Sequence, residues 1–145
     1  MQDTNYSVRK AYFQALQGFV IVGLTAIEVY DKMAPNNAVY PYIILSTQTD
    51  TDNSVKECFG HECTMLVDVV TGFNGAVESE MLDSICGQIL NRINPSGQRL
   101  TLTNNLQLIS TKLISDNTIE GQNGVWKILR RLLRFAHNVH EQVNI

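Results

Sequence analysis

The sequence predicts a single α+β domain over residues 1–145. Two segments, 8–20 and 76–93, repeat apolar residues every three or four positions, as amphipathic helices do. Two others, 41–49 and 62–73, read as strands, and the second alternates apolar with polar residues. A chain of 145 residues is typical of one domain and can bury a core without disulfide bonds.

The first predicted helix follows Ser7, whose hydroxyl is a suitable N-cap. Its apolar stripe consists of Val8, Ala11, Tyr12, Ala15, Leu16, Phe19 and Val20. The polar residues 1–6 ahead of it are expected to be flexible. Segment 20–30 is ambiguous, and 31–39 is expected to be a loop because it holds a proline followed by two asparagines.

The two strands that come next should pair as a β-hairpin. Pro41 cannot donate a ladder hydrogen bond, which suits the start of the strand at 41–49. In the strand at 62–73, one face is apolar and carries Cys63, Met65, Val67 and Val69. The polar residues 50–56 between the strands are expected to turn the chain.

The second helix should begin near residue 76 and end near 93. Its inward stripe consists of Met81, Leu82, Ile85, Cys86, Ile89 and Ile93. Arg92 at its end complements the helix dipole, as do three acidic residues near its start, Glu78, Glu80 and Asp83. We interpret these acids as dipole partners rather than as a catalytic cluster. Residues 94–97 contain the proline and glycine that should stop this helix.

The last third of the chain is harder to interpret. A third strand is expected at 106–114, and the polar residues 115–124 are expected to be an exposed connector. Segment 125–142 gives conflicting signals. A helical stripe is formed by Val125, Ile128, Leu129, Leu132, Leu133, Ala136 and Val139. Trp126, Ile128, Leu132 and Phe135 could instead line a bulged strand.

Composition limits the class of protein. The net charge of −3 argues against a dedicated nucleic-acid binder. Charged residues make up 17%, below the roughly 25% of typical soluble domains, which leaves room for contacts with other subunits. No run reaches the roughly 18–20 apolar residues of a membrane span, and the amino end does not read as a secretory signal. Three cysteines suit a reducing compartment, so we expect a soluble protein made in the cytoplasm.

Cys58, His61 and Cys63 are candidate ligands of a metal site, because thiolates and imidazole are good zinc ligands. Only three ligands are present, however, and the spacing of a zinc motif is absent. Cys63 also falls on the apolar face of its predicted strand, where a thiol acts as a small hydrophobe. The favoured interpretation is a turn beside a buried cysteine, with no metal and no cofactor.

No nucleophile pair is convincing either. Cys86 lies on the inward stripe of its helix, and a buried thiol is inert because its pKa is raised. His137 and His140 are three residues apart, and we interpret them as surface residues. The sequence has no Gly-rich phosphate loop. We therefore expect no enzymatic activity.

One basic cluster could carry function. Lys127, Arg130, Arg131 and Arg134 place four positive charges within eight residues. In a ring of subunits, symmetry would repeat this cluster around an axis, where it could contact the phosphates of threaded DNA. The alternative is a solvated face or salt bridges to a neighbouring subunit. Both roles stay open from the sequence.

The order of these segments resembles the small tail-completion proteins of long-tailed bacteriophages, also called tail terminators or head–tail joining proteins. The resemblance covers roughly residues 8–140 and depends on order and spacing, because its motifs are short. After the amino-terminal helix, the matching pieces are Val29-Tyr30-Asp31 with Pro35, the run 40–45, the strand 62–73, the helix ending at Ile93, and the segment 126–137.

This resemblance implies a mixed or antiparallel sheet of four to five strands with two helices packed on one face. It also implies that 125–142 is a strand. Members of the family are virion proteins, made in the bacterial cytoplasm, that form a ring of about six subunits. The expected partners are other copies, the tail tube protein and the head-completion or connector protein, and no membrane. The alternative is a cytoplasmic α+β binding module or a small metal-dependent enzyme that uses Cys58, His61 and Cys63.

Overall fold

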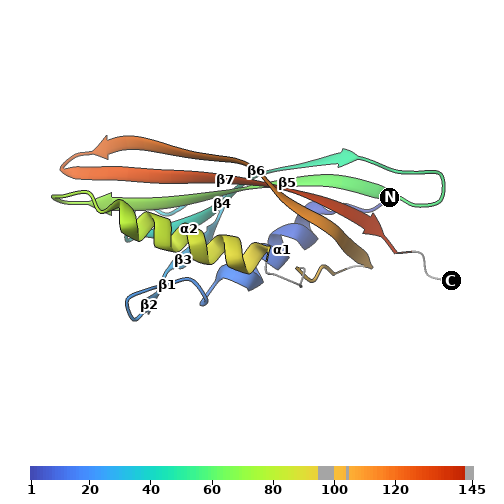
Figure 1. Ribbon diagram of the computed structural model, residues 1–145, viewed down its shortest axis with the longest axis horizontal. Helices are drawn as coiled ribbons and strands as arrows, with labels where there is room; N and C mark the ends of the chain where they lie inside the picture. Colours follow the sequence, from blue (N-terminus) through green and yellow to red (C-terminus); the bar gives the residue numbers. More distant parts are fainter. Residues whose placement is uncertain (95–99, 104, 143–145) are drawn as a thin grey trace.

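The computed structural model describes residues 1–94, 100–103 and 105–142. It has two layers: a long five-stranded sheet, and two helices that lie side by side on one of its faces (Figure 1). This arrangement confirms the predicted α+β class with both helices on one side. Among the described residues, no helix covers the opposite face of the sheet.

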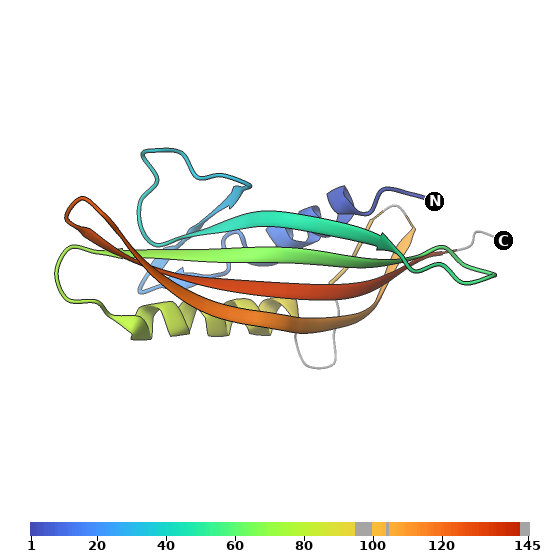
Figure 2. The ribbon, with the colours of Figure 1, turned by 90° about the horizontal axis from the view of Figure 1, so that it is seen from above.

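The large sheet is mixed. Its strands are β3 (Glu28–Asp31), β4 (Tyr42–Asp52), β5 (Gly60–Phe73), β6 (Leu106–Asn123) and β7 (Trp126–Glu141). They lie in the order β3-β4-β5-β7-β6, with β3 parallel to β4 and every other pair antiparallel (Figure 2). The predicted hairpin of the two middle strands is thus confirmed, as β4 and β5.

Strand β7 resolves the conflict over the last segment in favour of a strand. It lies in the interior of the sheet, paired with β5 on one side and β6 on the other. Alternate residues belong to the core under the helices: Leu129, Leu133, Phe135 and Val139. The residues between them, including Ile128, Leu132 and Ala136, share the other face. Apolar residues on both faces produce spacings of three and four, which imitate a helix.

Two polar segments that were predicted to be connectors are strand instead. Strand β4 continues to Asp52, and β6 continues to Asn123, where it turns tightly into β7. Residues 116–123 of β6 are exposed on both faces, so they show no apolar alternation. Gly124 has φ 62°, which suits the two-residue turn between the strands. The segment predicted to be an exposed connector, 115–124, is therefore mostly strand, although its side chains are largely exposed as predicted.

The helices match their predicted cores but not their predicted starts. Helix α1 (Asn5–Leu16) begins before Ser7, whose hydroxyl accepts a hydrogen bond from the Thr103 amide (2.9 Å) instead of capping the helix. Thr4 is fully buried, so the expectation that residues 1–6 are flexible does not hold for this residue. Helix α2 (Ser79–Ile93) ends where predicted. Residues 95–97 of the predicted stop signal lie outside the described residues.

The ambiguous segment 20–30 forms a small hairpin followed by β3. Strands β1 (Ile21–Val22) and β2 (Thr25–Ala26) pair around a two-residue turn whose first residue, Gly23, has φ 64°. Gln88 of α2 holds this hairpin: its amide donates to the Ile21 carbonyl (2.8 Å) and its carbonyl accepts from the Ile21 amide (2.8 Å). The hairpin is therefore fixed on the helix side of the molecule (Figure 1).

One core lies between the helices and the sheet. Its largest fully buried side chains include Tyr12, Leu16, Met65, Ile85 and Phe135. At roughly 1.5–3 kcal/mol for each large apolar side chain, this layer is the main source of stability. The described helices include none that is long and apolar enough to cross a membrane.

Candidate interaction surface

The uncovered face of the sheet is more apolar than a solvent-facing sheet surface needs to be. Strands with one wet face usually alternate apolar with polar residues. On this face of β5 and β7, Leu66, Ile128 and Leu132 are partly exposed, whereas Val70 is only 3% exposed. Exposed apolar patches mark interaction sites when they are contiguous. We therefore treat this face as the candidate functional surface.

Four aromatic rings gather at one end of this face. Tyr40 stacks on Tyr42, with centroids 5.6 Å apart and planes 18° apart, and it also contacts Trp126 at 5.4 Å. Tyr30 meets Tyr42 edge-on at 5.7 Å. Gly72 makes the packing possible, because a Cβ there would lie 2.5 Å from the Tyr40 ring. These rings come from β3, β4, β7 and the loop before β4.

A groove of about 380 Å³ opens beside the aromatic rings. Tyr40 and Tyr42 form one wall, and the arm formed by the ends of β6 and β7 forms the other. Its lining residues are Tyr40, Tyr42, Val70, Ile119, Glu120, Gly121, Gln122, Asn123, Ile128 and Arg130. Sequence reasoning missed this groove, because part of its wall was predicted to be a connector.

Arg130 on β7 binds Asp68 on the neighbouring strand β5. Its Nε donates to one carboxylate oxygen (3.2 Å) and Nη2 donates to the other. Asp68 is only 5% exposed, so the pair neutralises a carboxylate that is almost fully removed from water. The hydrogen bonds to Asp68 raise the pKa of Arg130, against the effect of burial. The main role of Arg130 is therefore structural, because its charge compensates that of Asp68.

Arg131 points to the other face of the sheet, as expected for the next residue on a strand. It donates from Nε and Nη2 to the Asp116 carboxylate (2.8 and 2.6 Å) and from Nη1 to Asp83 (3.2 Å). Arg131 thus joins β7 to β6 and to α2. Its hydrogen bonds lower the pKa of Asp116, and Asp83 serves as an ion-pair partner as well as a dipole partner.

The four basic residues do not form one cluster. Arg130 and Arg134 lie on the uncovered face, whereas Lys127 and Arg131 alternate with them along the strand. Lys127 is exposed and Arg134 is half-buried. Neither forms an ion pair within the described part of the chain. Only these two therefore keep a charge that is not committed to an internal carboxylate.

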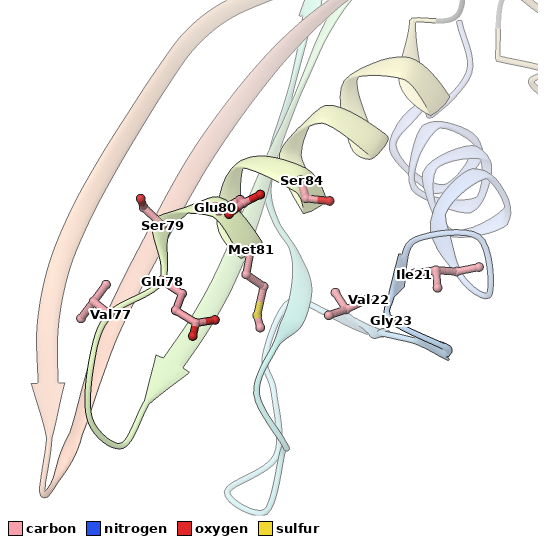
Figure 3. Close-up of a pocket in the computed structure, with 9 residues that line it drawn as sticks. All are labelled: Ile21, Val22, Gly23, Val77, Glu78, Ser79, Glu80, Met81 and Ser84. Carbon is pink, nitrogen blue, oxygen red and sulfur yellow. The ribbon is translucent and has the colours of Figure 1, made fainter.

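On the helix side, the β1–β2 turn exposes an apolar side chain. Leu24 at its tip is 103% exposed, and Ile21 is 45% exposed. A hollow of about 590 Å³ separates this hairpin from the start of α2. Glu78 and Glu80 line it on the helix side, and Ile21 and Val22 line it on the hairpin side (Figure 3).

His61 is the centre of a buried polar network at the far end of the sheet. It is 1% exposed, and its two ring nitrogens lie 2.9 Å from Asp50 Oδ1 and 3.0 Å from Glu141 Oε2. Burial disfavours the charged ring, but the hydrogen bonds to Glu141 and Asp50 outweigh it and raise the pKa of His61. Thr4 extends the network, because its hydroxyl donates to Asp50 (2.6 Å).

Two of the three candidate metal ligands, His61 and Cys63, contact groups of this network. Both nitrogens of His61 face carboxylates, and the Cys63 thiol lies 3.1 Å from the Thr4 hydroxyl. Burial raises the pKa of Cys63 to about 11, so this thiol is not a ready ligand. Cys58 lies in the β4–β5 loop, near the carbonyl oxygens of Phe59 and Glu141. Over residues 1–94, 100–103 and 105–142, no three His, Cys, Asp or Glu side chains are arranged so that they could hold a metal ion.

The histidines on β7 do not act together, and the prediction that both are surface residues was wrong. His137 is 2% exposed, and burial lowers its pKa to about 4. Its Nε2 is hydrogen-bonded to the Tyr12 hydroxyl, and its Nδ1 lies 3.0 Å from the Thr111 hydroxyl. His140 lies on the opposite face, because three residues along a strand change sides. As predicted, Cys86 is buried, and burial raises its pKa to about 12.

Comparisons with known proteins identify the fold. A scan against known protein families and a search of curated proteins gave no match. Among solved structures, a chain of the assembly described as the virion of native gene transfer agent (GTA) particle superposes with a TM-score of 0.76. The two chains are 17% identical, and the match covers 97% of this chain and 99% of that one. The chain therefore shares its fold, over nearly its whole length, with a chain of that GTA virion assembly.

Proposed function

We propose that this chain is a structural protein of a phage-like virion and has no catalytic role. The observation that carries the proposal is the fold match to a GTA virion chain, which covers 97% of this chain and 99% of that one. The apolar uncovered face supports a role in assembly, because such a face needs a partner.

Within the particle, we place the chain at the head-proximal end of the tail. The order of its elements resembles the tail terminators, and in that role it would close the tail tube and join it to the head connector. It would act as a ring of about six copies, each making a different contact on its two sides. Its partners would be other copies, the tail tube protein and the head-completion protein.

A contact with threaded DNA would fall to Lys127 or to Arg134, which lie on opposite faces of the sheet. Arg130 and Arg131 already bind Asp68, Asp83 and Asp116, so their charge is largely compensated within the chain. One uncommitted charge in each copy, on whichever face lined the channel, would still repeat around a ring and could contact phosphates without reading sequence. A weak, salt-dependent contact is what this arrangement supports.

Immunogold labelling of particles tests the proposal. Particles released by the cells that encode this chain would be purified and labelled with an antibody against it. We expect label at the joint between head and tail, and unjoined heads and tails when the gene is deleted. Label confined to the capsid shell or the distal tail would overturn the location but leave a structural role. Absence from intact particles would overturn the proposal as a whole.

A further inference from the structure

We infer that His61 is the centre of a pH-sensitive clasp, which holds the first residues of the chain against the sheet while the imidazole ring is charged. The clasp consists of His61, Asp50, Glu141 and the backbone amide of Gln2. When the ring loses its proton, the Glu141 side chain turns toward water and releases residues 1–3, while the sheet stays folded. The inference goes beyond the proposed function and does not depend on it.

Both ring nitrogens of His61 face a carboxylate oxygen. Nδ1 lies 2.9 Å from Asp50 Oδ1, and Nε2 lies 3.0 Å from Glu141 Oε2. An ionised carboxylate only accepts hydrogen bonds, whereas a neutral imidazole has one N–H donor and one acceptor nitrogen. A neutral ring would therefore place a lone pair against a carboxylate oxygen at one of the two contacts. Only the charged ring, with an N–H on each nitrogen, satisfies both.

The shared proton belongs to the ring and not to a carboxylate. Carboxyl groups ordinarily titrate near pH 4 and imidazole near about pH 6.5, so a ring between two carboxylates binds a proton first as the pH falls. Burial alone would raise the pKa of Glu141, but the hydrogen bonds from His61 and from the Gln2 amide outweigh burial and lower it. Glu141 therefore stays ionised while His61 titrates.

Glu141 connects the clasp to the amino end of the chain. It is the last residue of β7, and its Oε2 accepts a hydrogen bond from the Gln2 backbone amide (3.2 Å) as well as from His61. Within the described part of the chain, this is the one hydrogen bond that joins residues 1–3 to the sheet. The position of the Glu141 carboxylate therefore decides whether these residues are held.

Of the two carboxylates, Asp50 is the more firmly held. Its Oδ2 accepts from the hydroxyl of Thr4 (2.6 Å), a residue that is fully buried. Glu141 Oε1, in contrast, has no donor among the described residues, and the Glu141 side chain is 10% exposed at the end of its strand. A neutral ring therefore keeps its N–H on Nδ1, toward Asp50. The lone pair on Nε2 then repels Glu141, because a buried carboxylate without a donor is costly.

Other titratable groups lie around the clasp and come from the elements packed against it. They are the Met1 amino group and Asp3 ahead of α1, Asp52 on β4, Cys58 in the β4–β5 loop, Glu62 and Cys63 on β5, and His140 on β7. The carboxylates among them favour the charged ring. Burial raises the pKa of Cys63 to about 11, so this thiol stays neutral in the range where a histidine titrates. Residues 106–111 of β6 carry no titratable side chain.

A nuclear magnetic resonance titration from about pH 5.5 to about pH 9 follows the ring and the amino end together, since imidazole titrates within this range. The nitrogen shifts of His61 should show an N–H on both nitrogens at the acid end and on Nδ1 alone at the alkaline end. The Cα order parameter of Gln2, from carbon relaxation, should fall from about 0.8 to below about 0.6 with the midpoint of the ring. Unchanged signals from the core of β5 would show that the sheet stays folded.

Glu141→Gln tests the role of the second carboxylate. A side-chain amide can accept a hydrogen bond from a charged ring or donate one to a neutral ring, so Gln2 should stay ordered across the whole range and the pKa of His61 should fall. His140→Gln is the matched control, because His140 is the neighbouring residue but lies on the opposite face of β7. Acetylation of the Met1 amino group removes its titration and keeps the Gln2 amide. Both controls should reproduce the wild-type transition.

Three results would overturn the inference. The first is a single protonated nitrogen on His61 at the acid end of the titration. The second is a Gln2 order parameter that does not change when the ring loses its proton. The third is a transition that disappears on acetylation or persists in Glu141→Gln. None of these results depends on where the protein lies in a particle, so the immunogold experiment tests the proposed function separately.

Discussion

Arg130 and Asp68 join β7 to β5 across the uncovered face of the sheet, and the carboxylate is 5% exposed. The pair belongs to the floor of the groove and not to a basic surface. Removing one partner of such a pair leaves a charge that water cannot reach, whereas removing both does not. This difference can be measured.

We expect Arg130→Ala to destabilise the fold by about 2–4 kcal/mol, since it leaves the Asp68 carboxylate without its partner. The double variant Arg130→Ala/Asp68→Ala should lose less than the sum of the two single variants, with a coupling of about 1–3 kcal/mol. Urea unfolding of the four proteins completes the cycle. Additive losses would show that the pair contributes little.

Gly72→Ala should destabilise the protein by about 1–3 kcal/mol, because the new methyl group would lie 2.5 Å from the Tyr40 ring. The loss should shrink in a Tyr40→Ala background, where the space is free. Thermal unfolding of both pairs measures it. An equal loss with and without the Tyr40 ring would assign the effect to the strand backbone.

His137 predicts a loss of stability in mild acid. Its pKa is about 4 in the folded protein, because burial disfavours the charged ring, and about 6.5 in the unfolded chain. The unfolded state therefore binds more protons between these values, so stability should decline by up to about 3 kcal/mol as the pH falls from 6.5 toward 4. Urea midpoints across this range, compared with those of His137→Gln, isolate the effect. A variant that retains the full decline would contradict it.

For His61 we expect the opposite dependence of stability on pH. Its pKa is raised in the folded protein, so its contribution is complete below about pH 6.5 and is lost as the pH rises through the folded value. The stability difference between wild type and His61→Gln should therefore be largest in mild acid and shrink toward alkaline pH. Unfolding at several pH values measures this difference. A gap that stays constant with pH would show that His61 is neutral in the folded protein.

Much of the fold was predictable where one face of an element is buried. The stripe of α2 and the alternation of β5 both follow a single core, so their periods were clear. The sequence of β7 did not distinguish helix from strand, because both faces of this strand carry apolar residues. Leu132 and Leu133, for example, are neighbours in the chain and lie on opposite faces. The end of β6 was missed for the reverse reason: it is exposed on both sides, and a strand without a buried face has no period to detect.

The candidate surface was less predictable than the fold. Arg130 and Arg131 are neighbours in sequence, but a strand sends them to different faces and to different carboxylates. Asp68 and Asp116 are far from them in the chain, so neither partner could be inferred without the strand register. The one available signal was that β7 carries apolar residues on both of its faces, a pattern typical of strands that are buried on both sides.

The position of β7 has a consequence for synthesis. This strand holds β5 and β6 together, yet it is made after both of them. While the ribosome is still adding residues before Trp126, the nascent chain has an open edge along β5 and nothing to align β6. Completion of the sheet must therefore wait until the strand has left the exit tunnel, and in that interval the chain is most exposed to aggregation.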